Sequence, residues 1–336
     1  MKDKVLQVED FSLDAEINGE HYTAVDSIHF HVNEGEILGI VGESGCGKSL
    51  TALSVQGLLA PNVRVKSGRM LFGGSDLLAM SAAQRRAING RDITMIFQEP
   101  MTSLNPLMKI GRQIGEVLEL HTKQSKQEIR RQSAALLEEI GIFDVERILN
   151  SYPHQLSGGM RQRVMIAMAL ICNPRLLIAD EPTTALDVTT QAHVLALLKK
   201  INREHGTSML FISHDIGVIS SLCDRMLVMY GGKIMEKGET QEVLGHPANE
   251  YTKGLLASVP SREKKGAPLD CIPGRVPSVT EAKLPCPFAP RCPAAQDICS
   301  RKAPEERPLG GAHAVSCWNA VCTESGGRED TIWKKS

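Results

Sequence analysis

The sequence predicts an α/β fold in which a largely parallel β-sheet is interrupted by a helical insert. Residues 36–59 read EILGIVGESGCGKSLTALSVQGLL, which indicates a buried strand, a glycine-rich turn and a helix. Short apolar runs bounded by polar residues recur at 92–97, 175–180 and 208–213, as expected for buried parallel strands. Between residues 107 and 170 the pattern instead becomes helical.

Local patterns support two of these elements. In the stretch KQEIRRQSAALLEEIGI, the apolar residues Ile129, Leu136, Leu137 and Ile140 fall on one helical face. The stretch RMLVMYGGKIMEKG predicts a β-hairpin that turns at Gly231–Gly232.

The chain divides near residue 262 by composition. Proline and glycine become more frequent after Val259, and six of the nine cysteines follow. We therefore expect a first domain over 1–262, with its helical insert at about 99–170, and a small irregular cysteine-rich extension over 263–336.

Composition restricts the function classes. The chain is 42% hydrophobic and 23% charged, as in ordinary globular domains, and its net charge of −1 predicts no general attraction to nucleic acid. No run of about 18 apolar residues occurs, so we expect no membrane span. The first residues mix acids with lysines and do not resemble a secretory signal. The expected location is cytoplasmic, where structural disulfides are rare.

A phosphate-binding loop is predicted between the first strand and helix. The stretch GESGCGKS matches G-x-x-x-x-G-K-[ST] in the required strand–loop–helix context. Its amides would hold nucleotide phosphates, Lys48 would reach the β- and γ-phosphates, and Ser49 would ligate Mg²⁺. The alternative is a glycine-rich turn without a ligand. The loop consists of Gly42, Glu43, Ser44, Gly45, Cys46, Gly47, Lys48 and Ser49.

Polar residues follow three of the other predicted strands. Asp180 ends the strand in LLIADEP and can hold Mg²⁺, and Glu181 can activate the attacking water or simply end the strand. His214, in FISHD, can reach the γ-phosphate, although a lone histidine is more often structural. Gln98 ends MIFQ and is a candidate for sensing Mg²⁺ and water.

A second anion site is predicted at the stretch LSGGMRQRVMIAMAL. Ser157, Gly158 and Gly159 open a long helix, whose free amides and dipole favour an anion.

Together these motifs resemble an ABC-type ATPase over about residues 5–260, with LSGGM the most specific of them. The resemblance implies a P-loop NTPase fold with a RecA-like sheet core and an antiparallel β subdomain. It also implies head-to-tail pairing of two ATPases, in which Ser157, Gly158 and Gly159 contact the partner's ATP. Asp187 would lie at that interface. Tyr22 is the candidate for stacking on adenine, although a purely structural tyrosine is an equal alternative.

The cysteine tail suggests a metal site. Cys286, Cys292, Cys299 and Cys317 are spaced C-x5-C-x6-C-x17-C. Thiolates suit zinc or an iron–sulfur cluster, and the absence of a C-x2-C pair favours the cluster over zinc. Free thiols are the alternative, and His313 could replace one ligand. Because the nucleotide loop lies in the first domain, we expect nucleotide binding to survive loss of this site.

The tail also resembles one group of ABC importers. YTKGLLASVP, CPFAPRCP and QEPMTSLNP look like the ATPases of dipeptide and oligopeptide importers, a group that includes nickel and opine–metal importers. The resemblance implies a second ATPase, two membrane permeases and an extracytoplasmic binding protein. It implies a peripheral location on the cytoplasmic face of the inner membrane and, in some members, a [4Fe–4S] cluster. A soluble ABC protein of translation or DNA repair is a weaker alternative, because the chain has one ATPase half and little net charge.

Overall fold

An eight-stranded sheet forms the centre of the computed structural model, in the order β11-β12-β10-β9-β3-β8-β7-β6. Strands β9, β3, β8, β7 and β6 are parallel, and β10 pairs with β9 in the antiparallel sense. The described residues are 3–98, 103–184, 186–259, 271–281 and 283–320. The strands are β3 (Ile37–Val41), β6 (Ile93–Ile96), β7 (Leu176–Asp180), β8 (Ser208–Ser213), β9 (Arg225–Tyr230), β10 (Lys233–Glu239), β11 (Arg307–Gly310) and β12 (His313–Val315).

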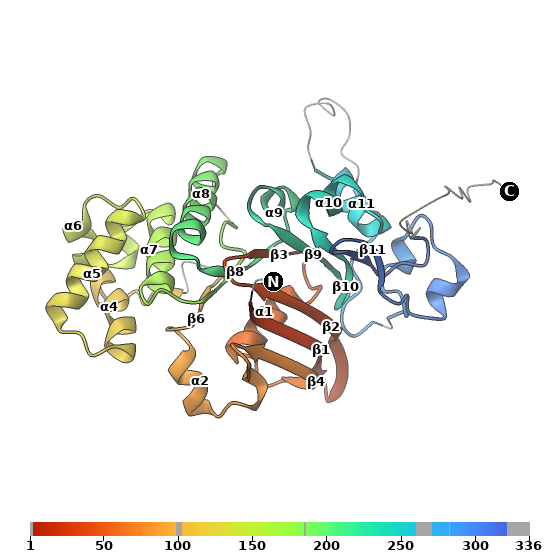
Figure 1. Cartoon of the computed structure of the whole chain (residues 1–336), viewed down its shortest axis with the longest axis horizontal. Coiled ribbons are helices and arrows are strands. Elements are labelled where there is room, and N and C mark those ends of the chain that lie inside the picture. The colour runs from red at the N-terminus through yellow and green to blue at the C-terminus, as the bar shows by residue number, and fades with distance from the viewer. Residues whose placement is uncertain (1–2, 99–102, 185, 260–270, 282, 321–336) are drawn as a thin grey trace.

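A second sheet of four antiparallel strands covers one face of the first (Figure 1). Its order is β2-β1-β4-β5, and its apolar residues share a core with Leu38, Ile40 and Ile178 of the central sheet. Helix α1 (Lys48–Gln56) packs into the same core through Ala52 and Val55. The strands are β1 (Lys4–Ile17), β2 (Glu20–Asn33), β4 (Val63–Phe72) and β5 (Ser75–Asp76), followed by η1 (Leu77–Ala79) and α2 (Ala82–Ile88).

Helices cover the opposite face of the central sheet. Because side chains alternate along a strand, Val41, Ala179 and Phe211 point to this second core. The helices of the insert gather at one end of the molecule, away from the cysteine-rich extension (Figure 1). The helices are α4 (Ile110–His121), α5 (Lys126–Glu139), α6 (Val145–Asn150), η2 (Pro153–Gln155), α7 (Gly158–Leu170), α8 (Val188–His205), α9 (Ile216–Leu222), α10 (Thr240–Gly245) and α11 (Glu250–Ala257).

The predicted elements are confirmed within a residue or two. The run at 208–213 is β8, and the hairpin of β9 and β10 turns at Gly231–Gly232. In α5, Ile129 and Leu137 are buried, and Leu136 packs against the same core. The boundary near 262 and the start of the insert at 99 lie outside the described residues.

The extension is less irregular than we expected. Strands β11 and β12 form a hairpin, and β12 pairs with the edge of β10, so the extension continues the central sheet. Among the residues described there, the segments that carry cysteines lack long elements and contain the short 3₁₀ turns η4 (Ala289–Arg291) and η5 (Asp297–Ser300). Strand β12 is held at the edge of the sheet by backbone hydrogen bonds. Three residues are too few to show a hydrophobic alternation, so the sequence pattern could not predict this strand.

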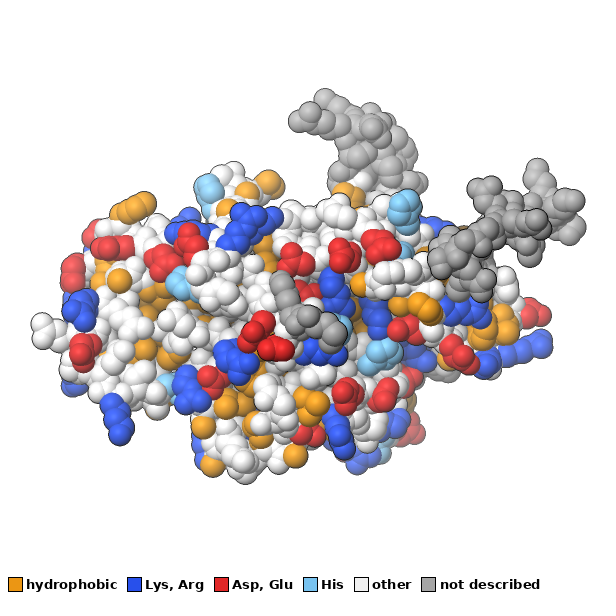
Figure 2. Space-filling model, viewed as in Figure 1, with side chains coloured by type: hydrophobic (Ala, Val, Ile, Leu, Met, Phe, Trp, Pro, Cys, Tyr) orange, Lys and Arg blue, Asp and Glu red, His pale blue; other side chains and the backbone are white. Residues whose placement is uncertain are grey.

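Charges of both signs are interspersed on the face shown in Figure 2. This agrees with the net charge of −1 and gives no basic stripe on that face. Among the helices that the structure describes, none is long and apolar enough to cross a membrane.

Candidate nucleotide site

The predicted phosphate loop connects β3 to α1, as the motif requires. Gly42 has no room for a side chain, because a Cβ there would lie 2.1 Å from the carbonyl oxygen of Met229. Gly47 has φ 104°, a left-handed conformation that favours glycine. Ser44 and Gly45 are exposed at the tip of the loop, where their backbone is open to a ligand. Cys46 is buried, and burial raises the pKa of its thiol.

Lys48 folds back over its own loop. Its Nζ donates to the carbonyl oxygens of Gly42 at 2.7 Å and Glu43 at 2.9 Å, and it lies 3.6 Å from Sγ of Cys46. The side chain is almost fully buried. A bound phosphate would therefore compete with these carbonyls for the ammonium group, whose three donors can turn toward a new acceptor.

Strand β7 brings Asp180 to the start of α1. Oγ of Ser49 donates to Oδ1 of Asp180 at 3.0 Å. Burial raises the pKa of the Asp180 carboxyl, an effect that the hydrogen bond from Ser49 and the charge of Lys48 partly oppose. A hydroxyl and a carboxylate at this separation are hard oxygen donors that fit Mg²⁺.

Three side chains converge on the carboxylate of Glu181. Its Oε2 accepts from Nε2 of Gln98 at 3.1 Å and from Oγ1 of Thr184 at 2.9 Å, and it lies 3.1 Å from Nδ1 of His214. Glu181 itself has φ 46°, a strained conformation that non-glycine residues adopt at functional sites. Its backbone N–H donates to the carbonyl of Ile212 in β8, which fixes the carboxylate beyond the ends of the parallel strands. Sequence reasoning found Gln98 and His214 but missed Thr184.

The predicted second anion site is at the start of α7, which is exposed. Ser157 caps the helix by accepting from the N–H of Met160, and both Ser157 and Gly158 are exposed. A Cβ at Gly158 would meet no atom within 4 Å. Among the described residues, Ser157 and Gly158 form no hydrogen bond with the Lys48 loop, so the two glycine-rich segments are separate within one chain.

Asp187 lies beside the glycines of the LSGGM motif (Leu156–Met160), which we call the signature. Asp187 caps α8 through the N–H and the hydroxyl of Thr190, and a Cβ at Gly159 would lie 3.1 Å from Cγ2 of Thr190. Hydrogen bonds from Thr190 lower the pKa of Asp187. Gln162 of α7 donates to the carbonyl of Pro182, directly after Glu181. The signature helix is thus bonded to the segment that carries the candidate catalytic carboxylate.

Tyr22 lies on β2, two residues before Ala24, which packs against Gly47 and Gly232. Its hydroxyl donates to Glu20, and that hydrogen bond, with Glu20's charge, raises its pKa. The ring is only partly buried and remains a candidate for stacking on adenine.

The four predicted cysteines come together. Cys286, Cys292, Cys299 and Cys317 line one small cavity, together with Phe288 and Trp318 among others. Burial raises the pKa of Cys286, of Cys292 to about 11, and of Cys317. His313 does not line this cavity: its Nε2 lies 2.8 Å from Oε1 of buried Glu236. His313 is therefore not the replacement ligand that the sequence allowed.

Comparisons with known proteins agree with this geometry. Residues 25–184 match the family described as ABC transporter, and 235–299 match the family described as oligopeptide/dipeptide transporter, C-terminal region. The dipeptide transport ATP-binding protein DppD of Bacillus subtilis is 47% identical over 94% of this chain and 95% of the relative. The oligopeptide transport ATP-binding protein OppD of Salmonella typhimurium is 46% identical over 90% of each chain.

This chain is an ABC transporter ATPase. Two solved structures of the same fold are similar to it. A dimeric ATP-binding cassette in a post-hydrolysis state with ADP and Pi aligns with a TM-score of 0.63 and 27% identity, over 70% of this chain and 98% of that one. A protein of the cbiONQ ABC transporter complex of Clostridium perfringens aligns with a TM-score of 0.62 and 28% identity, over 73% and 92%.

For this ABC transporter ATPase, the family fixes the general activity, which is ATP hydrolysis in a transporter. The C-terminal family match includes three of the four cavity cysteines and the arginine between the first two, Arg291. Sequence reasoning noted the cysteines and passed over that arginine, which contacts the phosphate loop.

Proposed function

We propose that this ATPase drives the import of dipeptides or oligopeptides. The proposal is supported by the transport functions in the names of its relatives and by the shared C-terminal region. It acts as a peripheral subunit on the cytoplasmic face of the inner membrane, beneath two permeases that receive cargo from an extracytoplasmic binding protein. The observation that carries the hydrolytic role is the convergence of Gln98, Thr184 and His214 on Glu181.

The same residues suggest a division of labour in hydrolysis. Glu181 accepts a proton from the attacking water, and Gln98 and His214 hold its carboxylate in position. Lys48 leaves the carbonyls of its loop and binds the β- and γ-phosphates. Ser49, Asp180 and Gln98 supply hard oxygen ligands for Mg²⁺, which would neutralise charge on the phosphates.

The outward-facing signature serves the ATP of a partner. Ser157, Gly158 and Gly159 bind the γ-phosphate held by the facing subunit, and Asp187 lies at the shared interface. ATP then joins the two ATPases, and its hydrolysis releases them. The partner is a second, related ATPase, so the pair is a heterodimer.

The cysteine cavity holds a [4Fe–4S] cluster. Four soft thiols around one cavity suit such a cluster, and a metal would compensate the burial that otherwise keeps the thiols protonated. In a closed tetrahedral zinc site, sulfur atoms lie about 3.8 Å apart. Among the described residues, no three of these thiols lie within 4.8 Å of one another, which is wider than a closed zinc site requires. The cluster would be structural, cross-linking segments too poor in apolar residues to fold alone.

Two measurements test the proposal. The tagged chain, captured from detergent-solubilised membranes, should bring down a second ATPase and two permeases. Reconstituted with its binding protein, the complex should hydrolyse ATP faster when di- or oligopeptides are added. Stimulation by nickel or a metal chelate alone would instead make it a metal importer. Capture without permeases would contradict the transport role.

A further inference from the structure

The cysteine-rich extension reaches the nucleotide site through Arg291. Arg291 ends η4 and directly precedes Cys292, and its side chain is almost fully buried. Its Nη1 donates to Oε2 of Glu43 at 2.7 Å, and its Nη2 donates to Oε1 at 3.1 Å. This is a bidentate pair with the second residue of the phosphate loop.

Every N–H of this guanidinium has an acceptor. Nη1 also donates to the hydroxyl of Tyr230 at 3.2 Å, Nη2 to the carbonyl of Ile272 at 3.2 Å, and Nε to that of Pro273 at 2.8 Å. A planar fork with all five donors used is fixed in position, and a lysine could not reproduce it.

Glu43 in turn joins this arginine to Lys48, the proposed phosphate-binding lysine. The backbone N–H of Glu43 donates to the hydroxyl of Tyr251 at 2.8 Å, and its carbonyl accepts from Nζ of Lys48 at 2.9 Å. The ring of Tyr251 packs against Tyr230 of β9, with ring centroids 4.7 Å apart, and against Phe288 of the extension, with centroids 5.2 Å apart. Glu43 therefore contacts both Arg291 and Lys48.

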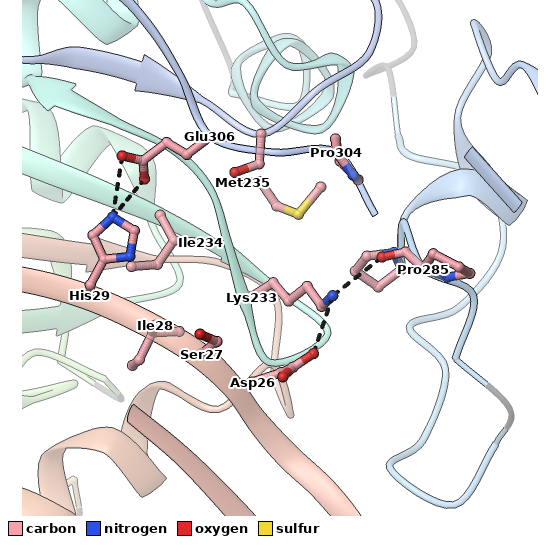
Figure 3. A pocket seen from close by; sticks show the side chains of 12 residues that line it. Asp26, Ser27, Ile28, His29, Lys233, Ile234, Met235, Pro285, Pro304 and Glu306 are labelled. Carbon is pink, nitrogen blue, oxygen red and sulfur yellow. Dashed lines mark hydrogen bonds and ion pairs between the residues drawn. The ribbon is translucent and has the colours of Figure 1, made fainter. Parts of the chain in front are cut away.

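The extension also contacts the ATPase domain at a second place. A cavity of about 270 Å³ lies between β2, β10 and the extension (Figure 3). At its rim Glu306 pairs with His29 at 3.2 Å, and Lys233 pairs with Asp26 at 3.1 Å and donates to the carbonyl of Pro285. Glu306 and the carbonyl of Pro285 thus bind the extension to β2 and β10, whereas the Lys233–Asp26 pair lies within the ATPase domain.

We propose that Arg291 is a positioning residue of the nucleotide site, which holds the Glu43 carboxylate away from the phosphates and neutralises it. Glu43 lies in the loop that binds a triphosphate, so an unpaired carboxylate there would repel the ligand. The extension is therefore part of the ATP site. This inference does not depend on the cargo or on a metal in the cysteine cavity.

The test measures nucleotide affinity of the purified full chain. We expect Arg291→Ala to raise the Kd for ATP about tenfold and the Kd for ADP less, because repulsion grows with phosphate charge. In the Arg291→Ala background, Glu43→Gln should restore the Kd for ATP to within about threefold of the original, since it removes the unpaired charge. Arg275→Ala is the matched control, because Arg275 is an exposed arginine of the extension that pairs only with Glu281 among the ion pairs of the described residues, and it should leave the Kd unchanged.

Two outcomes would overturn the inference. If Arg291→Ala lowers the melting temperature but leaves the Kd for ATP unchanged, the arginine only anchors the extension. If the Kd rises and the double variant is no better, the loss comes from misfolding of the loop rather than from the Glu43 charge. Arg291→Lys keeps the positive charge and loses the planar guanidinium, so it should give an intermediate Kd for ATP. A Kd equal to that of Arg291→Ala would contradict the neutralising role of the arginine.

Discussion

The two edges of the eight-stranded sheet contact the nucleotide site in different ways. At the β6 edge, Gln98 donates one hydrogen bond to Glu181 from an exposed side chain, and Gln162 of the helical insert donates another to the carbonyl of Pro182. The extension, which adds β12 and β11 to the other edge, contacts the site through Arg291, which binds Glu43 with a bidentate pair inside a set of five hydrogen bonds. Two isolated hydrogen bonds, one of them exposed, separate more readily than five around one buried guanidinium group. We therefore expect the β6 edge, with the helical insert, to move during turnover while the extension holds the phosphate loop still.

The largest effect should come from Glu181, the proposed catalytic carboxylate, to which Gln98 after β6 donates a hydrogen bond. We expect Glu181→Gln to reduce ATP hydrolysis by about 10²- to 10⁴-fold, because the amide cannot accept a proton from water. ATP binding should persist, and the closed ATP-bound complex should accumulate. Steady-state hydrolysis by the purified complex and nucleotide retention on gel filtration measure both effects.

Glu204→Gln is the control for this change, since Glu204 is exposed on α8 and pairs with Lys200. Hydrolysis near the original rate in Glu181→Gln would show that the partner's site carries the activity or that Glu181 is not the base.

The next effect should come from the signature at the end of the insert. We expect Ser157→Arg to lower hydrolysis by the assembled pair about 10²-fold, because bulk at an open helix start blocks contact with the partner's ATP. Binding of ATP at the Lys48 site should change little. Ser125→Arg removes an equivalent exposed serine cap from α5 and should leave hydrolysis nearly unchanged. Equal loss of ATP binding by Ser157→Arg at both sites would mean that the signature acts within its own chain.

The sequence predicted the β6 edge better than the β11 edge, and the reason is physical. Buried parallel strands are continuous apolar runs, and the residues at their carboxyl ends meet at one place, so Asp180, Glu181, His214 and Gln98 could be grouped from one sequence. The loop motif likewise demands a strand before it and a helix after it. The core and most of the hydrolytic site follow from patterns of this kind.

The β11 edge depends on contacts between distant segments that carry no periodicity. Strand β12 is three residues long, and Arg291 lies 248 residues from Glu43. The four cysteines could be grouped because thiols are rare and their spacing is suggestive, but nothing in the spacing says what they lie against. Two features of the sequence could have identified Arg291. It lies between Cys286 and Cys292, and the distant phosphate loop contains one acidic residue, Glu43, that needs a partner.

A smaller effect on turnover should follow when the cysteine site is broken. Cys292→Ser should abolish most bound iron and sulfide in anaerobically purified protein, together with the brown colour of the cluster. The sequence predicts that nucleotide binding survives this change. Because Cys292 adjoins Arg291, we also expect the Kd for ATP to rise, by less than about tenfold.

Cys271→Ser is the control for this variant, because Cys271 is exposed and does not line the cavity. Stoichiometric zinc without iron would contradict the cluster, and neither metal would favour free thiols. An unchanged Kd in a variant that has lost its iron would show that Arg291 keeps its place without the cluster.

The smallest effect on turnover should come from the buried pair that joins β12 to β10. His313 and Glu236 are both almost fully buried, and Glu236 also accepts from the N–H groups of Ala248 and Asn249. Removing the imidazole leaves a buried carboxylate with one donor fewer, which costs about 1–3 kcal/mol of stability. We expect His313→Ala to lower the melting temperature by roughly 2–10 °C and to leave ATP turnover within about twofold. The comparison variant is His29→Ala, whose half-exposed pair with Glu306 lies on the same seam and should contribute under about 1 kcal/mol. If His313→Ala and His29→Ala have the same melting temperature, the buried His313–Glu236 pair does not anchor β12. The β11 edge would then be less rigid than its hydrogen bonds imply.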